Sequence, residues 1–505
     1  MQNFIERHNI KIKGVISCFD RIVLTGTMPG ICDAQGMSSF LTTQGIRIFD
    51  FTQWAEPLRE EIRVNAEKVA RDNGLEIDFI RKKNFRKETR ISDIIKQRGT
   101  HPGLVHIFSA MEVCTAYKPW YNKKTRQTSL KTVTSKCLHY YFYFIHAELG
   151  LCYLRVPTWA PFRLQFYCNG HNLLASALSK KNIDFQMLDN VFVHIDDFDK
   201  AQKFADDIHM KSLHRELDKI VRQYCPIVRH FVNRYYWSVM QVEYATDIIF
   251  KQRSDLKLIY DEIVRTAIHS VKPETIATFL GRKLHGGYED EMGNHFNTRI
   301  EGTCIKHRMG SVAVKMYDKF GLVLRVETVA NDVSFFKHHR RVEHRDGTWE
   351  MKDAPLKKSI YSLPMLVELM KASNRRYLDF VSAIDDPSSG IKDLNKISRS
   401  VKEDERSYRG FNLFDGDDLD LFNTITRGEF NIRGFSNKCL RKVIKGKKGH
   451  QVSRLLKRLR KHGLIKKITN TYKYYLTALG RRVTATALKL REMYIIPSLR
   501  GVLAG

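Results

Sequence analysis

The chain has 505 residues, of which 43% are hydrophobic and 28% are charged, and 85 basic against 55 acidic residues give it a net charge of +30. This composition excludes a disordered chain, and the length suffices for three or four domains of about 150 residues. The sequence contains no apolar run long enough to cross a bilayer and starts without an apolar signal segment. We therefore expect a cytoplasmic protein with no membrane partner.

The positive charge is concentrated near the end of the chain. Residues 431–500 contain 20 basic residues and one acidic residue, so they carry +19 and leave +11 for the rest. Such a concentration favours a polyanion as partner, and the remaining excess indicates a second basic surface. The nine cysteines are scattered without a CxxC motif, which is typical of reduced thiols and excludes a zinc ribbon.

Residues 1–115 are predicted to form an α/β domain. A β-rich run over 13–30 ends in a turn at Pro29-Gly30. The segments that follow are predicted as helix, strand, helix and strand over residues 38–45, 46–51, 54–74 and 75–82.

Residues 116–280 are predicted to contain an aromatic antiparallel sheet followed by a helical region over 200–280. Aromatic and basic side chains alternate along the aromatic strands, at Tyr140, Tyr141, Tyr143, Arg155, Arg163 and Tyr167. These side chains either stack on the bases of a single-stranded nucleic acid, which makes RNA an alternative partner, or pack in the core of the sheet. Core packing is the favoured interpretation.

Residues 281–400 are predicted as antiparallel strands and helices. Three strands follow one another over 298–336, with turns near 308–310 and 319–321. The pieces Tyr317-Asp318-Lys319 and Arg325-Val326-Glu327 resemble the "YDK … RxE" signature of rolling-circle replication initiators of plasmids and phages. The resemblance implies that a metal-bound acid and a tyrosine nucleophile nick one DNA strand.

Counting along the predicted hairpins places Glu327 on the same row and face as His307. We therefore expect Glu327 and His307 to bind Mg²⁺ or Mn²⁺. Tyr377 is the candidate nucleophile, because it lies on a predicted helix beside Arg375 and Arg376, which are candidate phosphate ligands. Tyr235 and Tyr236 are the second choice. For any single tyrosine, ordinary packing is the competing interpretation.

Residues 401–505 are predicted as helix, helix, basic helix, β-hairpin and helix. Val452, Leu455, Leu456 and Leu459 form one apolar stripe, and the opposite face of that helix is basic. This order resembles the winged helix-turn-helix of MarR-type transcription regulators. The resemblance implies DNA-binding residues in the major groove (Arg454, Lys457, Arg458 and Lys461) and on the wing (Lys466, Lys467 and Lys473). A basic helix used for protein contacts is the alternative.

The whole chain is thus expected to be a multidomain α+β protein that binds duplex or single-stranded DNA. A homodimer is one option, and the oligomeric state stays open. Three functions stay open: a DNA-binding protein of a replicon or mobile element that nicks one strand, a non-catalytic transcription regulator, and an RNA-binding protein. No P-loop, GxSxG, HExxH or dinucleotide fingerprint is present, which argues against nucleotide hydrolysis and redox chemistry.

Overall fold

The computed structural model describes the chain apart from residues 83, 283–291, 300–301, 345, 383–396, 404, 413, 428, 431–433, 445, 470, 492–495 and 497–505. The described residues form an α+β protein with one large mixed sheet and four two-stranded sheets. None of the helices in these ranges is both long enough and apolar enough to span a membrane.

The chain folds into two compact units, each assembled from segments that are discontinuous in the sequence. Unit 1 comprises Met1–Ser17, Ala245–Ala330 and Glu368–Gly505. Unit 2 comprises Cys18–Tyr244 and Asn331–Val367.

The large sheet has the strand order β10-β11-β12-β13-β9-β1-β6-β5-β4-β3-β2. Its short strand β2 pairs in parallel with β3, whereas the hairpin partners β3 and β4, β10 and β11, and β12 and β13 are antiparallel. The strands of this sheet are β1 (Ile12–Thr27), β2 (Ile77–Phe79), β3 (Gly103–Asn122), β4 (Gln127–His146), β5 (Gly150–Pro157), β6 (Leu164–Cys168), β9 (Tyr236–Phe250), β10 (Met292–Arg299), β11 (Gly302–Met309), β12 (Val312–Lys319) and β13 (Val323–Ala330).

The small sheets are hairpins that each join two consecutive strands. They are β7 (Phe185–Leu188) with β8 (Val191–Ile195), β14 (Lys337–Glu343) with β15 (Trp349–Pro355), β16 (Val401–Glu403) with β17 (Arg406–Tyr408), and β18 (Ile465–Lys467) with β19 (Tyr474–Leu476).

The described α-helices carry apolar residues at helical spacing. In α3, for example, Ala55, Leu58 and Ile62 are buried on one side. The helices are α1 (Gln2–Arg7), α2 (Ala34–Thr43), α3 (Phe51–Asp72), α4 (Lys87–Arg98), α5 (Gly170–Lys180), α6 (Phe198–Asp206), α7 (Met210–Tyr224), α8 (Arg253–Ser270), α9 (Pro273–Phe279), α10 (Leu363–Val381), α12 (Gly416–Ile425), α14 (Asn437–Val443), α15 (Gly449–Lys461) and α16 (Ala478–Leu490).

In unit 1, α10 packs on one face of the sheet through a chain of buried hydrogen bonds. Thr328 of β13 donates to Asn374 of α10 at 2.6 Å, and Asn374 donates to Thr246 of β9 at 3.2 Å. Ser17 of β1 donates to the same Thr246 at 3.0 Å. Because successive residues of a strand point to opposite faces, Glu327 lies on the face away from α10.

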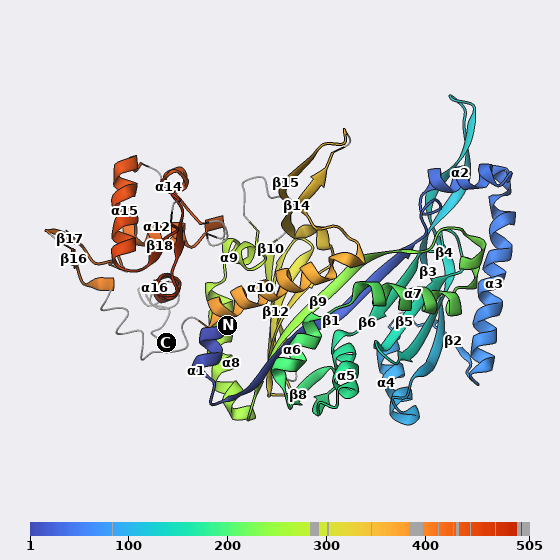
Figure 1. Ribbon diagram of the computed structural model, residues 1–505, viewed down its shortest axis with the longest axis horizontal. Helices are drawn as coiled ribbons and strands as arrows, with labels where there is room; N and C mark the ends of the chain where they lie inside the picture. Colours follow the sequence, from blue (N-terminus) through green and yellow to red (C-terminus); the bar gives the residue numbers. More distant parts are fainter. Residues whose placement is uncertain are drawn as a thin grey trace. The chain divides into compact units, whose positions relative to one another are not determined.

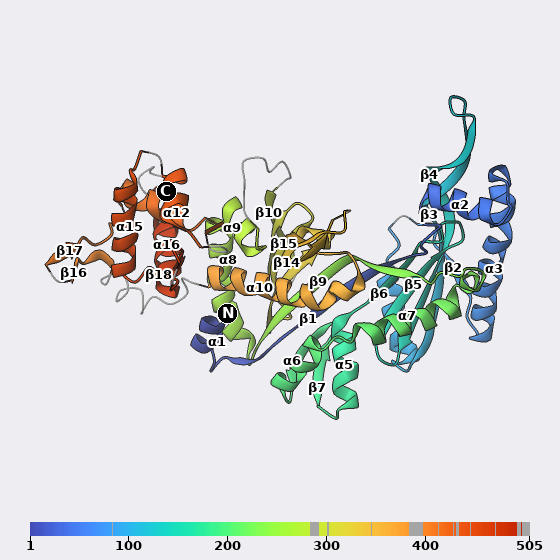
Figure 2. The ribbon, with the colours of Figure 1, turned by 45° about the horizontal axis from the view of Figure 1, so that its top comes forward.

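In unit 2, the longest hairpin joins β3 and β4. Figures 1 and 2 show the far ends of these two strands extending past α2 as a two-stranded ribbon. The ribbon is anchored near α2, where the Tyr117 hydroxyl donates to the Ile31 carbonyl at 2.9 Å and the Leu130 amide donates to Ser38 Oγ at 2.9 Å.

The C-terminal elements of unit 1, α12 to α16 with β18 and β19, lie together in Figure 2. They share a hydrophobic core whose buried members all fall between Ile397 and Ala487. The apolar stripe predicted for α15 contributes Val452, Leu456 and Leu459 to this core. Helix α16 also reaches α8, where Lys489 Nζ donates to Thr266 Oγ1 at 3.0 Å.

Several local predictions differ from the structure. The predicted strand over 46–51 is a 3-10 helix (Ile48–Asp50) leading into α3, and the predicted helical region over 200–280 contains the strand β9. The pieces AIDDPSSG (383–390) and ISRSVKEDERSYRG (397–410) predict a linker before the C-terminal domain; residues 383–390 lie outside the described residues, and residues 397–410 contain the hairpin of β16 and β17. None of the nine cysteines, all of which lie in the described residues, forms a disulfide: Cys439 on α14 is exposed, Cys32 and Cys114 are half-buried, and the others are buried.

Candidate nucleic-acid interface and candidate metal centre

Helix α15 carries a basic surface on the side opposite its buried stripe. Arg454, Lys457 and Arg460 are exposed there, with His450 one turn before them. Lys457 Nζ lies 5.5 Å from the centre of the Tyr408 ring. Two of the four groove residues that the sequence predicted, Arg454 and Lys457, are therefore accessible to a ligand.

Arg458 and Lys461 do not lie freely on that surface, so their expected exposure was wrong. Arg458 is buried, and its guanidinium donates to both carboxylate oxygens of Asp418, at 2.7 and 2.8 Å. It also donates to the carbonyls of Arg409 and Gly410, at 3.1 and 2.7 Å. Lys461 is half-buried and forms an ion pair with Glu403. Because α15 packs on two sides, a basic residue beside the apolar stripe is enclosed rather than solvated.

The β18–β19 hairpin provides a second group of exposed cations. Lys466 and Lys467 lie at the end of β18, and Lys473 precedes β19; all three are exposed. Lys467 Nζ lies 5.7 Å from the centre of the exposed Tyr472 ring. The hairpin register pairs Ile465 with Leu476, and both of these side chains are buried, so the hairpin is fixed to the core at its base.

The exposed cations of this region are not balanced by carboxylates in the part of the chain that the structure describes. No described ion pair involves the following residues: Arg441, Lys442, Lys448, Arg454, Lys457, Arg460, Lys466, Lys467 and Lys473. Neighbouring like charges repel one another, and an anion bound across them relieves that repulsion. The surface thus has the electrostatic character of a polyanion-binding surface.

Tyr377, the predicted nucleophile, is fully buried on α10. Its hydroxyl lies 3.2 Å from Nε2 of His307, while Nδ1 of His307 lies 2.6 Å from Oδ1 of Asn294. Because Oδ1 of Asn294 only accepts, Nδ1 carries the imidazole proton and Nε2 accepts from the tyrosine. Burial raises the pKa of Tyr377 well above its ordinary value and lowers that of His307 to about 3. This pair is a neutral hydrogen bond in the core, and it is closed to DNA.

The two arginines beside Tyr377 have different surroundings. Arg376 donates to the carbonyls of Thr278 and Phe279, at 3.0 and 2.7 Å, so its guanidinium is held by the C-terminal end of α9. Burial lowers the pKa of Arg376 to about 10. Arg375 is exposed. Of the predicted pair of phosphate ligands, Arg375 alone is accessible.

The two second-choice tyrosines differ in their surroundings. Tyr235 is buried, and its hydroxyl donates to the Phe162 carbonyl at 2.9 Å, whereas Tyr236 is exposed. On the aromatic sheet, Tyr140, Tyr141 and Tyr143 are all buried. The core-packing interpretation therefore holds for these three tyrosines, whereas Arg155 and Tyr167 are half-buried and Arg163 is exposed.

The strand register separates Glu327 from His307, so the predicted metal pair was wrong. His307 pairs with Val314, and Val314 pairs with Thr328, whereas Glu327 pairs with Lys315. His307 thus shares a face with Thr328, and Glu327 points to the other face. The turn between β12 and β13 runs from Lys319 to Val323. The pairing of these two strands is therefore shifted by three residues from the pairing that the sequence count assumed.

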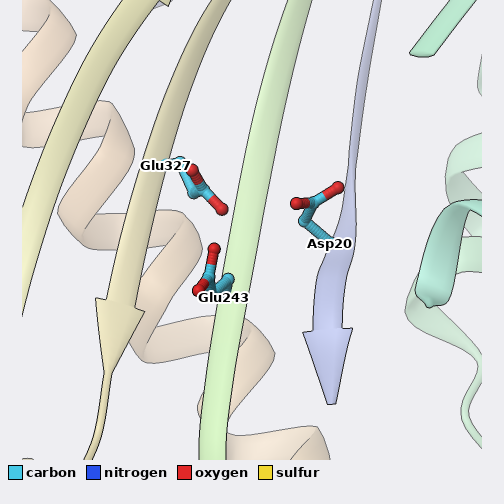
Figure 3. Close-up of side chains that lie close together, drawn as sticks. All are labelled: Asp20, Glu243 and Glu327. Carbon is cyan, nitrogen blue, oxygen red and sulfur yellow. The ribbon is translucent and has the colours of Figure 1, made fainter. Parts of the chain in front are cut away.

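Glu327 lies instead with two other carboxylates, Asp20 of β1 and Glu243 of β9 (Figure 3). One oxygen of each group lies within 4.8 Å of one oxygen of both others, and Figure 3 shows the three side chains pointing toward one another. Carboxylate oxygens are the ligands that Mg²⁺ and Mn²⁺ prefer. Glu327 keeps its place as a candidate ligand, and Asp20 and Glu243 replace His307.

Glu327 is 1% exposed and also contacts two groups from β12. The Tyr317 hydroxyl donates to Glu327 Oε2 at 3.0 Å, and Lys315 Nζ lies 3.4 Å from the same oxygen. One positive charge thus already faces this buried carboxylate, which lowers the cost of keeping it ionised.

Asp20 and Glu243 have partners of their own. Asn190 Nδ2 donates to Asp20 at 2.7 Å, and His171 Nδ1 lies 3.2 Å from the same carboxylate. Arg21 Nε lies 3.7 Å from Glu243. The protein therefore offsets part of the negative charge of the cluster, and a divalent cation would offset more.

Asp20 and Glu243 were missed because a single acid inside a long strand has no local motif. The available signal was a charged residue within an apolar β-rich run, as for Asp20 in SCFDRIVL.

Comparisons of the chain with protein-family models, with curated proteins and with solved structures gave no match.

Proposed function

We propose that the protein binds duplex DNA through its C-terminal elements, with α15 as the helix that enters the major groove and the β18–β19 hairpin as a wing. The observation that supports this most directly is the set of exposed cations on α15 and the hairpin with no described carboxylate partner. The order α12, α14, α15, hairpin, α16 agrees with a winged helix-turn-helix.

The proposed contacts divide by position. Arg454 and Lys457 lie one turn apart on the exposed side of α15, where they reach base edges or the phosphates beside them. Lys466, Lys467 and Lys473 on the hairpin contact phosphates. Arg458 is left out of this interface because Asp418 already binds both ends of its guanidinium.

Binding of the full-length protein to a labelled duplex at several salt concentrations tests this function. Arg454→Gln with Lys457→Gln should weaken binding and flatten its salt dependence, because each lost phosphate contact removes about one unit of slope. Lys68→Gln with Lys203→Gln serves as a matched control, since both lysines are exposed on helices of unit 2, α3 and α6. Binding that is unaffected by the double substitution would rule out α15 as the DNA-reading helix.

Metal-dependent strand cleavage is a second candidate function, and the carboxylate cluster of Asp20, Glu243 and Glu327 is the observation that favours it. Because Tyr377 is buried on the other face of the sheet, cleavage at this cluster would use a water molecule activated by the ion rather than a tyrosine. The chain's own contribution would be to hold the ion and keep the three carboxylates in place.

Calorimetric titration of the protein with Mn²⁺ tests this second candidate. The wild-type protein should bind the ion and Glu327→Gln should lose that binding, whereas Glu343→Gln, an exposed acid on β14, should behave as wild type. Equal Mn²⁺ binding by the wild type and Glu327→Gln would show that the cluster is not a metal site.

A further inference from the structure

The outer halves of β3 and β4, residues 113–136, form a basic ribbon that we call the arm (Figures 1 and 2). The arm contains six basic residues and no acidic residue, so it carries +6. Every one of these basic side chains is exposed: Lys118, Lys123, Lys124, Arg126, Lys131 and Lys136.

Two of these lysines face each other directly. Lys118 pairs with Lys131 in the strand register, so their side chains point to the same face of the ribbon. Like charges directly across a β-ladder are destabilising. No described ion pair involves either lysine. The charge of this face is therefore available to an external anion.

The same face carries an exposed aromatic side chain. Trp120 pairs with Ser129 two ladder positions toward the tip, on the same face as Lys118, and is 46% exposed; the neighbouring Tyr121 is 47% exposed. Large exposed aromatic side chains next to lysines are typical of surfaces that contact bases or sugars together with phosphates.

The arm is anchored at its base and ordered at its tip. Tyr117 and Leu130 are both buried, and their hydrogen bonds to the α2 region hold the ribbon in place. At the tip, Asn122 Oδ1 accepts from the amides of Lys124 and Thr125, at 3.0 and 3.4 Å. The loop cations thus project from a defined turn, so little conformational entropy is lost when they bind.

We propose that the arm is a second DNA-contacting surface, which enters a groove of the duplex and binds the phosphates on both sides of it. A two-stranded ribbon fits the major groove, which is about 12 Å wide. Cations on both strands and on the tip match the two phosphate rows that border a groove, and Trp120 then contacts base or sugar edges. The arm extends the proposed function and rests on it for the choice of ligand.

The test measures binding of the full-length protein to duplex DNA as a function of salt concentration, by fluorescence anisotropy. Lys118→Gln with Lys131→Gln should reduce the slope of log affinity against log salt by about 2, because two phosphate contacts are lost. The thermal midpoint should stay the same or rise, since the repulsion between the two lysines is removed. The matched control replaces two exposed helical lysines of unit 2, Lys68→Gln with Lys203→Gln, and should leave the slope unchanged.

The Arg454→Gln, Lys457→Gln protein separates this proposal from the proposed function. If that protein loses affinity while the arm variant binds as wild type, the arm is not a DNA contact and the C-terminal surface is. If the arm variant alone loses affinity, the arm proposal stands and the role of α15 falls. If the arm substitutions instead abolish binding to phosphatidylserine vesicles and leave DNA affinity unchanged, the partner is a membrane and the arm proposal is overturned.

Discussion

Arg458 and Asp418 form a bidentate ion pair, with nitrogen–oxygen distances of 2.7 and 2.8 Å, and both side chains are less than a tenth exposed. The pair joins the last turn of α15 to the first turn of α12. Arg458 is therefore a buried structural residue of the most basic helix, whereas Arg454, four residues earlier, is exposed to solvent.

Substitution of Arg458 should therefore affect stability, whereas substitution of Arg454 should affect DNA binding. Arg458→Gln should lower the free energy of unfolding by about 3 to 5 kcal/mol, because it leaves the Asp418 carboxylate buried without its partner. Arg454→Gln should leave that free energy within about 0.5 kcal/mol of the wild type and weaken DNA binding by about 1 to 3 kcal/mol. Urea unfolding and duplex titration of both variants check this, and a stable Arg458→Gln protein would contradict it.

Replacement of the Tyr377 hydroxyl should have a small structural effect. Tyr377→Phe removes the hydrogen bond to His307 and leaves a buried nitrogen without its donor, at a cost of about 1 to 3 kcal/mol. A denaturing gel after incubation with DNA and Mn²⁺ should show no difference in covalent adducts between this variant and the wild type. An adduct that depends on Tyr377 would instead restore the tyrosine as a nucleophile.

Acidification should destabilise unit 1 through His307. Burial lowers the pKa of His307 to about 3, against an ordinary value of about 6.5 in the unfolded chain. Between these values the unfolded state binds a proton that the folded state does not, so stability is complete above about pH 6.5 and decreases as the pH falls toward 3. The loss is on the order of a few kcal/mol.

Urea midpoints of the wild type and His307→Gln at about pH 7 and about pH 4.5 measure this effect. The glutamine variant should be less stable at neutral pH and should lose less stability on acidification. It should keep part of the pH dependence, because burial and then the Arg155 charge lower the pKa of His139 to about 4. Equal acid sensitivity in the two proteins would show that His307 is not the group responsible.

The C-terminal elements should fold as an isolated fragment, because their core is made of residues between Ile397 and Ala487. Ile397 is 2% exposed, and the Phe411 amide donates to its carbonyl at 2.9 Å. A fragment of residues 397–505 should therefore melt cooperatively and at a higher temperature than one of residues 401–505. Loss of a buried isoleucine costs about 2 to 5 kcal/mol, which scanning calorimetry resolves readily.

Local sequence patterns predicted the helices and turns of this protein better than they predicted which strands and side chains come together. The spacing of Val452, Leu456 and Leu459 gave the buried side of α15, and the turns expected near Gly310 and Gly321 are present, both with left-handed glycines. These features depend on residues only a few positions apart, so the sequence alone determines them.

The candidate sites depended on pairings that are distant in sequence. The turn between Lys319 and Val323 sets the register of β13, and a shift of three positions was enough to move Glu327 to the other face from His307. Asp20 and Glu243 meet Glu327 because β1, β9 and β13 are neighbours in the sheet, although the residues are more than 80 positions apart in the chain. Asp418 is likewise 40 residues from Arg458.

The distribution of the cysteines provides a chemical measure of folding. Burial raises the pKa of the Cys168 and Cys225 thiols to about 12, so these groups do not form the thiolate that alkylating reagents need at neutral pH. Cys439 on α14 is the exposed thiol. Maleimide should modify the native protein first at this one position and the denatured protein at all nine cysteines. The mass of the modified chain therefore distinguishes folded from unfolded molecules. A dye placed on Cys439 without any substitution would also sit beside the basic C-terminal surface.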